Sequence, residues 1–159
     1  WVTGLAKKDS LKKTCPDCFM TNKTPAIVID SNVLISAGIL PKSRLANILV
    51  MAVGRFVIAQ NSATWNEMIS RIEREKFDRY FGENGRLAYL SKLAQLVQFF
   101  DVVADERVSR DPDDDKFVSL ALDAGATIII SGDRDLKEIR MHKGIEIMSP
   151  SAFLERFTE

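Results

Sequence analysis

The sequence predicts an α/β domain in which a central parallel sheet of about five strands is covered by helices on both faces. Short apolar runs rich in β-branched residues alternate along the chain with longer amphipathic segments, and the connections between them are short. A strand that is buried on both faces is a continuous apolar run, and strict alternation of strands and helices is typical of a parallel sheet. We therefore expect a three-layer sandwich.

The expected strands are apolar runs that are too short to form helices. The first strand covers residues 26–30, where Ala26-Ile27-Val28-Ile29 ends abruptly at Asp30. The other strands are expected at residues 56–59, 99–103, 127–130 and 145–148. Ligands of parallel sheets bind at the carboxyl ends of strands, so Asp30 stands where a site would be built.

The expected helices carry apolar residues at helical spacing and have recognisable ends. Ser43 can cap a helix that stops near Gly54. Asp111, followed by Pro112, is a strong start signal for a helix that ends before Gly125. Further helices are expected at residues 62–72, 87–97 and 134–142, and from Ser149 onward. The charged segment 71–86, with its interleaved aromatic residues, predicts a helical arm that projects from the sheet.

Composition limits the class of protein. The chain has 159 residues, 46% of them hydrophobic, which suits one globular domain. It has neither an apolar run long enough to span a membrane nor a signal-peptide pattern, so we expect a cytoplasmic protein. Its formal net charge is zero. That balance argues against a protein that grips nucleic acid mainly by bulk charge, although it allows local basic patches beside an acidic pocket.

Residues 1–24 differ from the rest of the chain and are expected to be a tail or adaptor segment before a domain at residues 25–159. They carry five Lys against two Asp and show no clear periodicity. Their Cys15 and Cys18 form a lone CxxC pair. A structural zinc site needs about four ligands, and His142 is the chain's only histidine, so two plain thiols are the preferred interpretation.

Three aspartates are predicted to converge at one edge of the sheet. Asp30 follows the first strand, and Asp133 follows the strand at 127–130 after Ser131 and Gly132. Asp115 lies about one turn inside a helix start. Clustered carboxylates repel one another unless a cation relieves the repulsion, and oxygen ligands favour Mg²⁺ or Mn²⁺ over zinc. Such a site suits metal-assisted phosphodiester hydrolysis, in which the ions activate water and stabilise charge on the phosphate.

Three motifs in this arrangement resemble the PIN domain, a family of metal-dependent ribonucleases common among toxins of toxin–antitoxin pairs. The family's opening motif, an apolar strand ending in Asp-Thr/Ser-Asn-Val, is similar to VIDSNVLISA. The central acidic motif resembles RDPDDDKFVSLALDAGA, and the closing Thr/Ser-x-Asp-x-Asp-Leu motif resembles ISGDRDLKEI. The resemblance covers residues 26–153 and implies a PIN-like three-layer fold of the VapC type.

Position by position, the resemblance implies that the catalytic acids are Asp30, Glu67, Asp115 and Asp133. Of these, Asp30, Asp115 and Asp133 would bind the metal. Asn32 and Ser131 match positions that orient the metal-binding carboxylates by hydrogen bonds. The resemblance further implies an RNA substrate, an antitoxin partner and a homodimer.

Several residues also have ordinary structural explanations. Asp111, Asp113 and Asp114 lie at a helix start, where negative charge is favourable without a ligand. Glu67 could be a solvated glutamate paired with Arg71 one helical turn away. Asp135 could support the metal ligands or cap a short helix. Arg71 and Arg74 are candidates for RNA phosphate contacts, although a solvated charged face is equally consistent with them.

Two other functions compete with the nuclease. The first is a catalytically silent PIN-like domain that acts as a binding or assembly module; retention of all four acids argues against it. The second is a phosphotransfer domain of the receiver or haloacid-dehalogenase kind. The dehalogenase kind would need a second aspartate at the position of Asn32, and a receiver would need paired acids after the first strand.

Overall fold

The computed structural model describes residues 23–158, so most of the expected segment 1–24, including Cys15 and Cys18, lies outside the described residues. Six strands form one sheet in the order β3-β2-β1-β4-β6-β5. All neighbours are parallel except β5 and β6. The strands are β1 (Ala26–Ile29), β2 (Val57–Gln60), β3 (Val97–Phe99), β4 (Ala126–Ile130), β5 (Met141–His142) and β6 (Ile145–Met148). The predicted α/β sandwich is confirmed, with one additional short strand.

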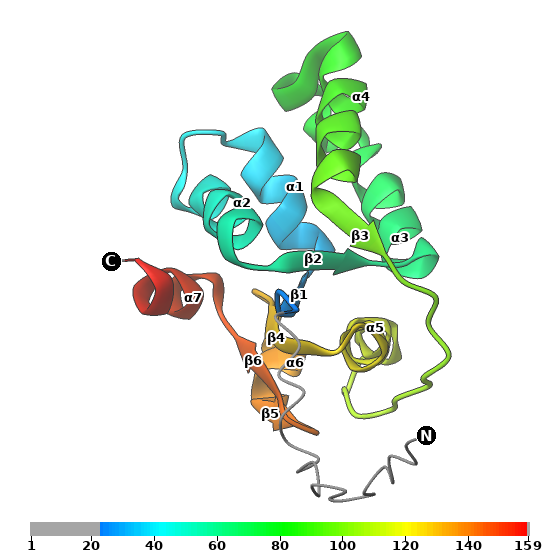
Figure 1. Cartoon of the computed structure of the whole chain (residues 1–159). Helices are drawn as coiled ribbons and strands as arrows, with labels where there is room; N and C mark the ends of the chain where they lie inside the picture. Colours follow the sequence, from blue (N-terminus) through cyan, green and yellow to red (C-terminus); the bar gives the residue numbers. More distant parts are fainter. Residues whose placement is uncertain (1–22, 159) are drawn as a thin grey trace, which may run out of the picture.

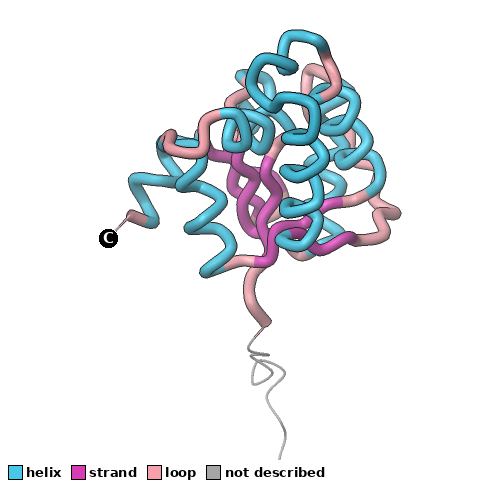
Figure 2. Tube along the Cα trace, turned by 90° about the horizontal axis from the view of Figure 1, so that it is seen from above, coloured by secondary structure: helices cyan, strands magenta, loops and turns pink. Residues whose placement is uncertain are grey.

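Helices cover both faces of this sheet. One face packs against α1 (Ser31–Ile39), α2 (Arg44–Arg55), α3 (Ser62–Ile72), α4 (Asp78–Leu96) and α7 (Pro150–Phe157). The other face packs against α5 (Asp115–Ala124) and α6 (Arg134–Ile139). Figure 1 shows α1 to α4 on one side of the strands and α5 on the other, and in Figure 2 the strands run between the helices. The architecture is a three-layer α/β/α sandwich.

Strand β1 lies inside the sheet and supplies side chains to both cores. Ile27 and Ile29 belong to the core beneath α1 to α4, whereas Ala26 and Val28 belong to the core beneath α5 and α6. All four residues are buried. Successive side chains of a strand point to opposite faces, so a strand covered on both faces must be apolar throughout. This explains the unbroken apolar run that ends at Asp30.

Several ends of the elements follow the capping signals in the sequence. The side chain of Ser43 accepts a hydrogen bond from Ala46 N at the start of α2, and Ser149 accepts one from Ala152 N at the start of α7. Gly125 ends α5 in the left-handed conformation, with φ of 64°. Glycine adopts that conformation without a steric penalty, which explains its place there.

Several segments differ from the expected elements. Strand β3 covers Val97–Phe99 instead of the expected residues 99–103, because its pairing with β2 begins at Val97. Residues 31–39 form α1 directly after β1, because Asp30 serves as its N-cap. The expected arm and the helix at 87–97 become a 3₁₀ turn, η2 (Glu75–Phe77), followed by α4, which is interrupted at Gly82 with φ of 63°. Helix α6 ends at Ile139, and residues 141–142 form β5 as an antiparallel edge strand.

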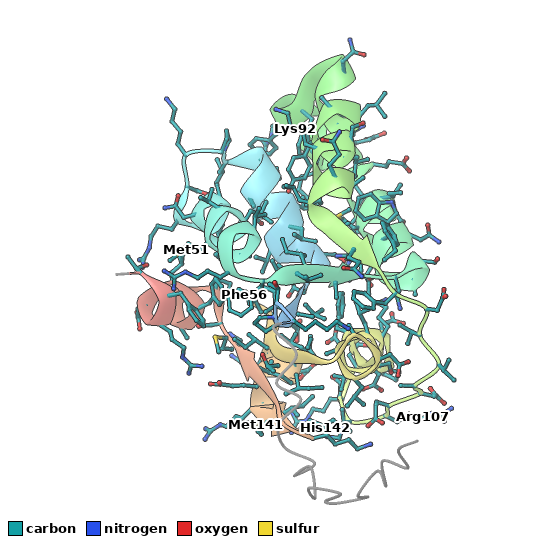
Figure 3. All side chains as sticks on the ribbon, viewed as in Figure 1. Met51, Phe56, Lys92, Arg107, Met141 and His142 are labelled. Atoms are coloured by element: carbon teal, nitrogen blue, oxygen red, sulfur yellow. The ribbon has the colours of Figure 1, made fainter. Side chains whose placement is uncertain are left out.

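The carboxyl-terminal helix is anchored by aromatic rings. Phe56, which precedes β2 and is labelled in Figure 3, has its ring centroid 6.1 Å from that of Phe153 and 5.4 Å from that of Phe157. Aromatic pairs at such separations add to the stabilisation from buried area.

Within residues 23–158 no single helix is long and apolar enough to cross a membrane. Helices α1 and α2 pass the length and hydropathy test only as a pair, and a bend of 113° separates them.

Candidate metal centre

The acidic residues gather at the carboxyl edge of the sheet, where the strand order changes direction. From β1 the chain continues to β2 on one side, and β4 later joins β1 on the other side. Asp30 directly follows β1, and Asp133 lies three residues beyond the end of β4. Such a switch point is the usual ligand site of an open parallel sheet.

Asp30 is a buried carboxylate held by three donors. Its Oδ1 accepts from Val33 N at 2.8 Å, and its Oδ2 accepts from Gly132 N at 3.2 Å and from the hydroxyl of Ser131. The side chain therefore caps α1 and also ties β1 to the segment after β4. Burial raises the pKa of Asp30 above its usual value, and the three hydrogen bonds oppose that rise. A cation would favour the ionised form further.

Asp30 opens into a small cavity of about 70 Å³. The cavity is lined by Asp30, Ser31, Asn32, Glu67, Arg71, Asp111, Asp114, Phe117 and Asp133. Five of these nine residues are acidic, and Arg71 is the single cation among them. The space suits one or two ions or a few waters, since each water occupies about 30 Å³ of liquid.

The central acidic motif contributes Asp111 and Asp114 to this cavity. Burial, followed by the negative charges of Asp133, Asp111, Asp30 and Glu67, raises the pKa of Asp114 to about 6. Asp111 caps the 3₁₀ turn η3 (Pro112–Asp114) by accepting from Asp113 N at 2.9 Å. Asp114, expected only as a helix-start charge, thus faces three of the predicted site acids.

Asp115 does not line the acidic cavity, although the sequence predicts it as a ligand. It is 8% exposed and lines the adjoining cavities along the β3–α5 connection. Its Oδ1 accepts from Val108 N at 3.0 Å and from Ser109 N at 2.7 Å. The carboxylate therefore holds the connection between β3 and α5 against the start of α5.

Glu67 lies between two cations. Its Oε1 is 2.7 Å from the guanidinium of Arg71, and its Oε2 forms an ion pair with Lys116. Both oxygens are enclosed and accept no well-directed hydrogen bond in the described part of the chain, so ionic contacts alone balance the charge. Glu67 therefore pairs with Arg71 as expected and lines the acidic cavity, but it is not a solvated glutamate.

The predicted supporting residues have different contacts. Ser131 orients Asp30 and also accepts from Asp133 N at 2.9 Å. Asn32 instead accepts a hydrogen bond from Arg71 through its Oδ1 at 2.9 Å. Asp133 is the N-cap of α6 and accepts from Asp135 N at 2.7 Å, so Asp135 lies in the first turn of that helix and is not its cap. Arg74 is exposed and does not line the cavity.

The donor set fits a hard divalent cation. The cavity offers carboxylates, and burial together with their mutual repulsion raises the pKa of Asp114; a bound cation would relieve that repulsion. Within residues 23–158, no three Asp, Glu, His or Cys side chains already form a ready metal-binding group. Ligation therefore requires rotation of side chains, and Glu67 would have to leave one of its two ion pairs to take part.

The sequence does not indicate a site role for three residues: Asp111 and Asp114 line this cavity, and Lys116 pairs with Glu67 from the adjoining cavity. Within the run DPDDDK, a helix-start explanation accounted for the first acids, and the run itself did not indicate which carboxylate turns inward. The 3₁₀ turn at residues 112–114 determines that choice, because it places Asp114 at the cavity.

The fold and the site together define an α/β domain with an acidic centre at the switch point of its sheet. Residues 26–135 match the family described as the PIN domain. The chain belongs to the PIN domain family, whose members are generally hydrolytic nucleases that use divalent metals.

One relative and two solved structures extend the comparison. The chain is 30% identical over 141 residues to the uncharacterized protein MJ1680 of Methanocaldococcus jannaschii, an alignment that covers 82% of this chain and 90% of the relative. The structure is similar to VapBC2 from Rickettsia felis bound to a DNA fragment from their promoter, with a TM-score of 0.56, 13% identity and coverage of 78% and 98%. It is also similar to PAE2754 from Pyrobaculum aerophilum, with a TM-score of 0.50, 16% identity and coverage of 87% and 93%. Both structures support the PIN-like fold.

Proposed function

We propose that this chain is an endoribonuclease that depends on Mg²⁺ or Mn²⁺ and hydrolyses RNA phosphodiester bonds. The observation that carries the proposal is the convergence of five carboxylates in one cavity at the switch point between β1 and β4. Carboxylates repel one another there, and phosphodiester hydrolysis uses cations held by such groups.

Asp30, Asp114 and Asp133 would hold the cation, and Glu67 would assist ligation or orient the attacking water. Asp115, the ligand implied by the family motif, is compared with Asp114 in the experiment below. A bound Mg²⁺ or Mn²⁺ supplies positive charge to the phosphate as the bond breaks. Ser131 keeps the Asp30 carboxylate in place, and Arg71 lies at the cavity wall, where it can contact an RNA phosphate.

The biological setting that we propose is the toxin of a type II toxin–antitoxin pair. The fold similarity to VapBC2 and the membership of the PIN family support this setting. Under this proposal the chain forms homodimers and binds a protein antitoxin that blocks cleavage. Co-expression of the gene with its neighbour in the genome, followed by purification of a complex, would test that part.

Five substitutions test the nuclease proposal: Asp30→Asn, Glu67→Gln, Asp114→Asn, Asp115→Asn and Asp113→Asn. Each purified variant is titrated with Mn²⁺ by calorimetry and incubated with a broad RNA panel, whose fragment ends are sequenced. Asp113 is the matched control, because it is exposed, lies in the same acidic run and does not line the cavity.

We expect Asp30→Asn and Asp114→Asn to lose Mn²⁺ binding and cleavage, Glu67→Gln to lose cleavage more than Mn²⁺ affinity, and Asp113→Asn to behave like the wild type. If Asp115→Asn loses Mn²⁺ binding and Asp114→Asn keeps it, Asp115 is the ligand, as the family motif implies. A wild-type protein that binds no Mn²⁺ and cleaves no RNA would instead be the silent binding module.

A further inference from the structure

A second cavity adjoins the acidic one on the other side of α5's first turn. It measures about 330 Å³ and is lined in part by Asn61, Ala63, Val102, Ala104, Lys116 and Ser119. The connection from β3 to α5, which bends around α5 in Figure 1, forms one wall. Ligand pockets begin at about 300 Å³, so this space can receive a base and its sugar, whereas the acidic cavity of about 70 Å³ cannot.

An ion pair joins the two cavities. Glu67 lines the acidic cavity, Lys116 lines the larger one, and the two side chains are paired with each other. A polynucleotide strand with its phosphate at the acidic cavity and its neighbouring nucleotide in the larger cavity would pass over this pair. Lys116, with a quarter of its side chain exposed, is the cation at that crossing.

The acids around the larger cavity are already compensated. Asp115 accepts two backbone N–H groups, and Glu106 is 2.7 Å from His142 Nε2 and 2.8 Å from Lys143 Nζ. Asp105 is 3.1 Å from Arg107. Arg107 and His142 both lie on the side of the molecule where the β3–α5 connection runs (Figure 3). The wall therefore repels a phosphate less than its acid content suggests.

Lys116 can leave Glu67 without stranding a buried charge. Removing one partner of a buried ion pair is costly because the other charge is left unpaired. Glu67, however, keeps Arg71 at 2.7 Å when Lys116 turns away. The geometry makes Lys116 the cation that is cheaper to redirect, because Arg71 also donates to Asn32 and is held at both ends.

We propose that the larger cavity is a nucleotide-binding subsite and that Lys116 binds the phosphate of the nucleotide held there. The role of this subsite in RNA cleavage rests on the proposed nuclease function. The binding of a nucleotide there does not require cleavage and can be measured separately. Asn61 and the backbone of the β3–α5 connection would meet the base and sugar. The subsite would position the strand next to the scissile phosphate.

The test uses nucleoside 5′-monophosphates, which contain no phosphodiester bond to cleave. The ¹⁵N-labelled full chain is titrated in Mg²⁺ buffer with AMP, CMP, GMP, UMP and, separately, inorganic phosphate, and amide shifts are followed by NMR. We expect at least one mononucleotide to shift the amides of Ala63, Ala104 and Ser119. Phosphate alone should bind more weakly and shift only amides next to Lys116.

Four variants locate the contact. Lys116→Gln should weaken mononucleotide binding about tenfold, as expected for loss of a hydrogen bond to a charged group, and Lys116→Arg should largely retain it. Lys92→Gln, exposed on α4 and labelled in Figure 3, is the matched control and should bind like the wild type. Ala63→Glu places a repelling carboxylate at an exposed position of the same cavity and should weaken binding even if Lys116→Gln unfolds.

Cleavage assays separate this inference from the proposed function. On RNA, Lys116→Gln should raise KM more than it lowers kcat and reduce the salt slope of binding by about 0.7, the loss of one phosphate contact. An active nuclease whose KM and salt slope do not respond to Lys116→Gln, or whose Ala63, Ala104 and Ser119 amides ignore every mononucleotide, overturns the subsite alone. An inactive protein that still binds mononucleotides there overturns the nuclease and keeps the subsite.

Discussion

The hydroxyl of Ser131 donates a hydrogen bond to Oδ2 of Asp30, although 101 residues separate the two in sequence. This contact ties the exits of β1 and β4 together at the acidic cavity. It also lowers the pKa of Asp30 against the opposing effect of burial.

Replacing Ser131 with alanine should therefore weaken both the fold and the metal site. We expect Ser131→Ala to reduce the free energy of unfolding by about 1–3 kcal/mol, because a buried carboxylate loses a donor. Mn²⁺ affinity should fall by about tenfold or more, as is usual when the support of a ligand is removed. Denaturant unfolding and calorimetry measure the two effects. Ser131→Thr, which keeps the hydroxyl, should retain more of both; equal losses in the two variants would contradict the hydrogen-bond explanation.

Asp114 should make the metal-free protein less stable as pH rises. Its pKa of about 6 in the folded protein lies above the ordinary value of 3.8, so the folded state binds this proton more tightly than the unfolded state. The stability it contributes is present below about pH 4 and is lost as pH rises through 6. Asp114→Asn should therefore raise the thermal unfolding temperature at pH 7.5 and lose that advantage towards pH 4. An advantage that does not change with pH would point to another cause.

Metal removal should have an effect that depends on Asp30. A cation that binds only the folded state stabilises it by about 2.7 kcal/mol at a concentration one hundred times its Kd. Excess Mn²⁺ should raise the unfolding temperature of the wild type, and EDTA should reverse the rise. The same additions should leave Asp30→Asn unchanged. A comparable rise in both proteins would place the binding elsewhere.

Gly38 on α1 should not tolerate a larger side chain. A Cβ there would lie 2.5 Å from the ring of Tyr89, which is packed against α1 and donates to the carbonyl of Leu34. Gly38→Ala should cost about 1–3 kcal/mol, the usual range for overpacking. Gly54→Ala, at the end of α2 with open space around it, is the control and should be neutral or stabilising by up to about 1 kcal/mol. Chemical denaturation measures the free energy of unfolding of both variants. Equal values would show that the Tyr89 ring moves aside at little cost.

The parts of the fold that the sequence predicted well are those with a strong local pattern. The apolar run at residues 26–29 and the cap at Ser43 depend on neighbours in sequence, and both are present in the structure. The start of β3 and the strand at residues 141–142 depend on pairing with distant strands. A single sequence carries little signal for such pairings, so the observed bounds of β3 differ from the predicted ones and β5 was not predicted.

The candidate site divides along the same line. Asp30 and Asp133 could be expected at one edge, because Asp30 directly follows a recognisable strand, Asp133 lies three residues beyond another, and parallel strands end at one edge. The choice between Asp114 and Asp115 could not be made, because the 3₁₀ turn at residues 112–114, which the sequence does not indicate, places Asp114 at the cavity. The pairing of Glu67 with Lys116 could not be predicted either, because it joins α3 to α5, two helices that cover opposite faces of the sheet.

The position of β1 between β2 and β4 determines when this protein acquires its site during synthesis. β1 and β2 are both made early, but β4 and Ser131 leave the ribosome only after most of the chain has been translated. Until then Asp30 lacks its partner and the acidic cavity lacks one wall. A nascent chain therefore carries only part of the acidic cavity until Ser131 and Asp133 have emerged.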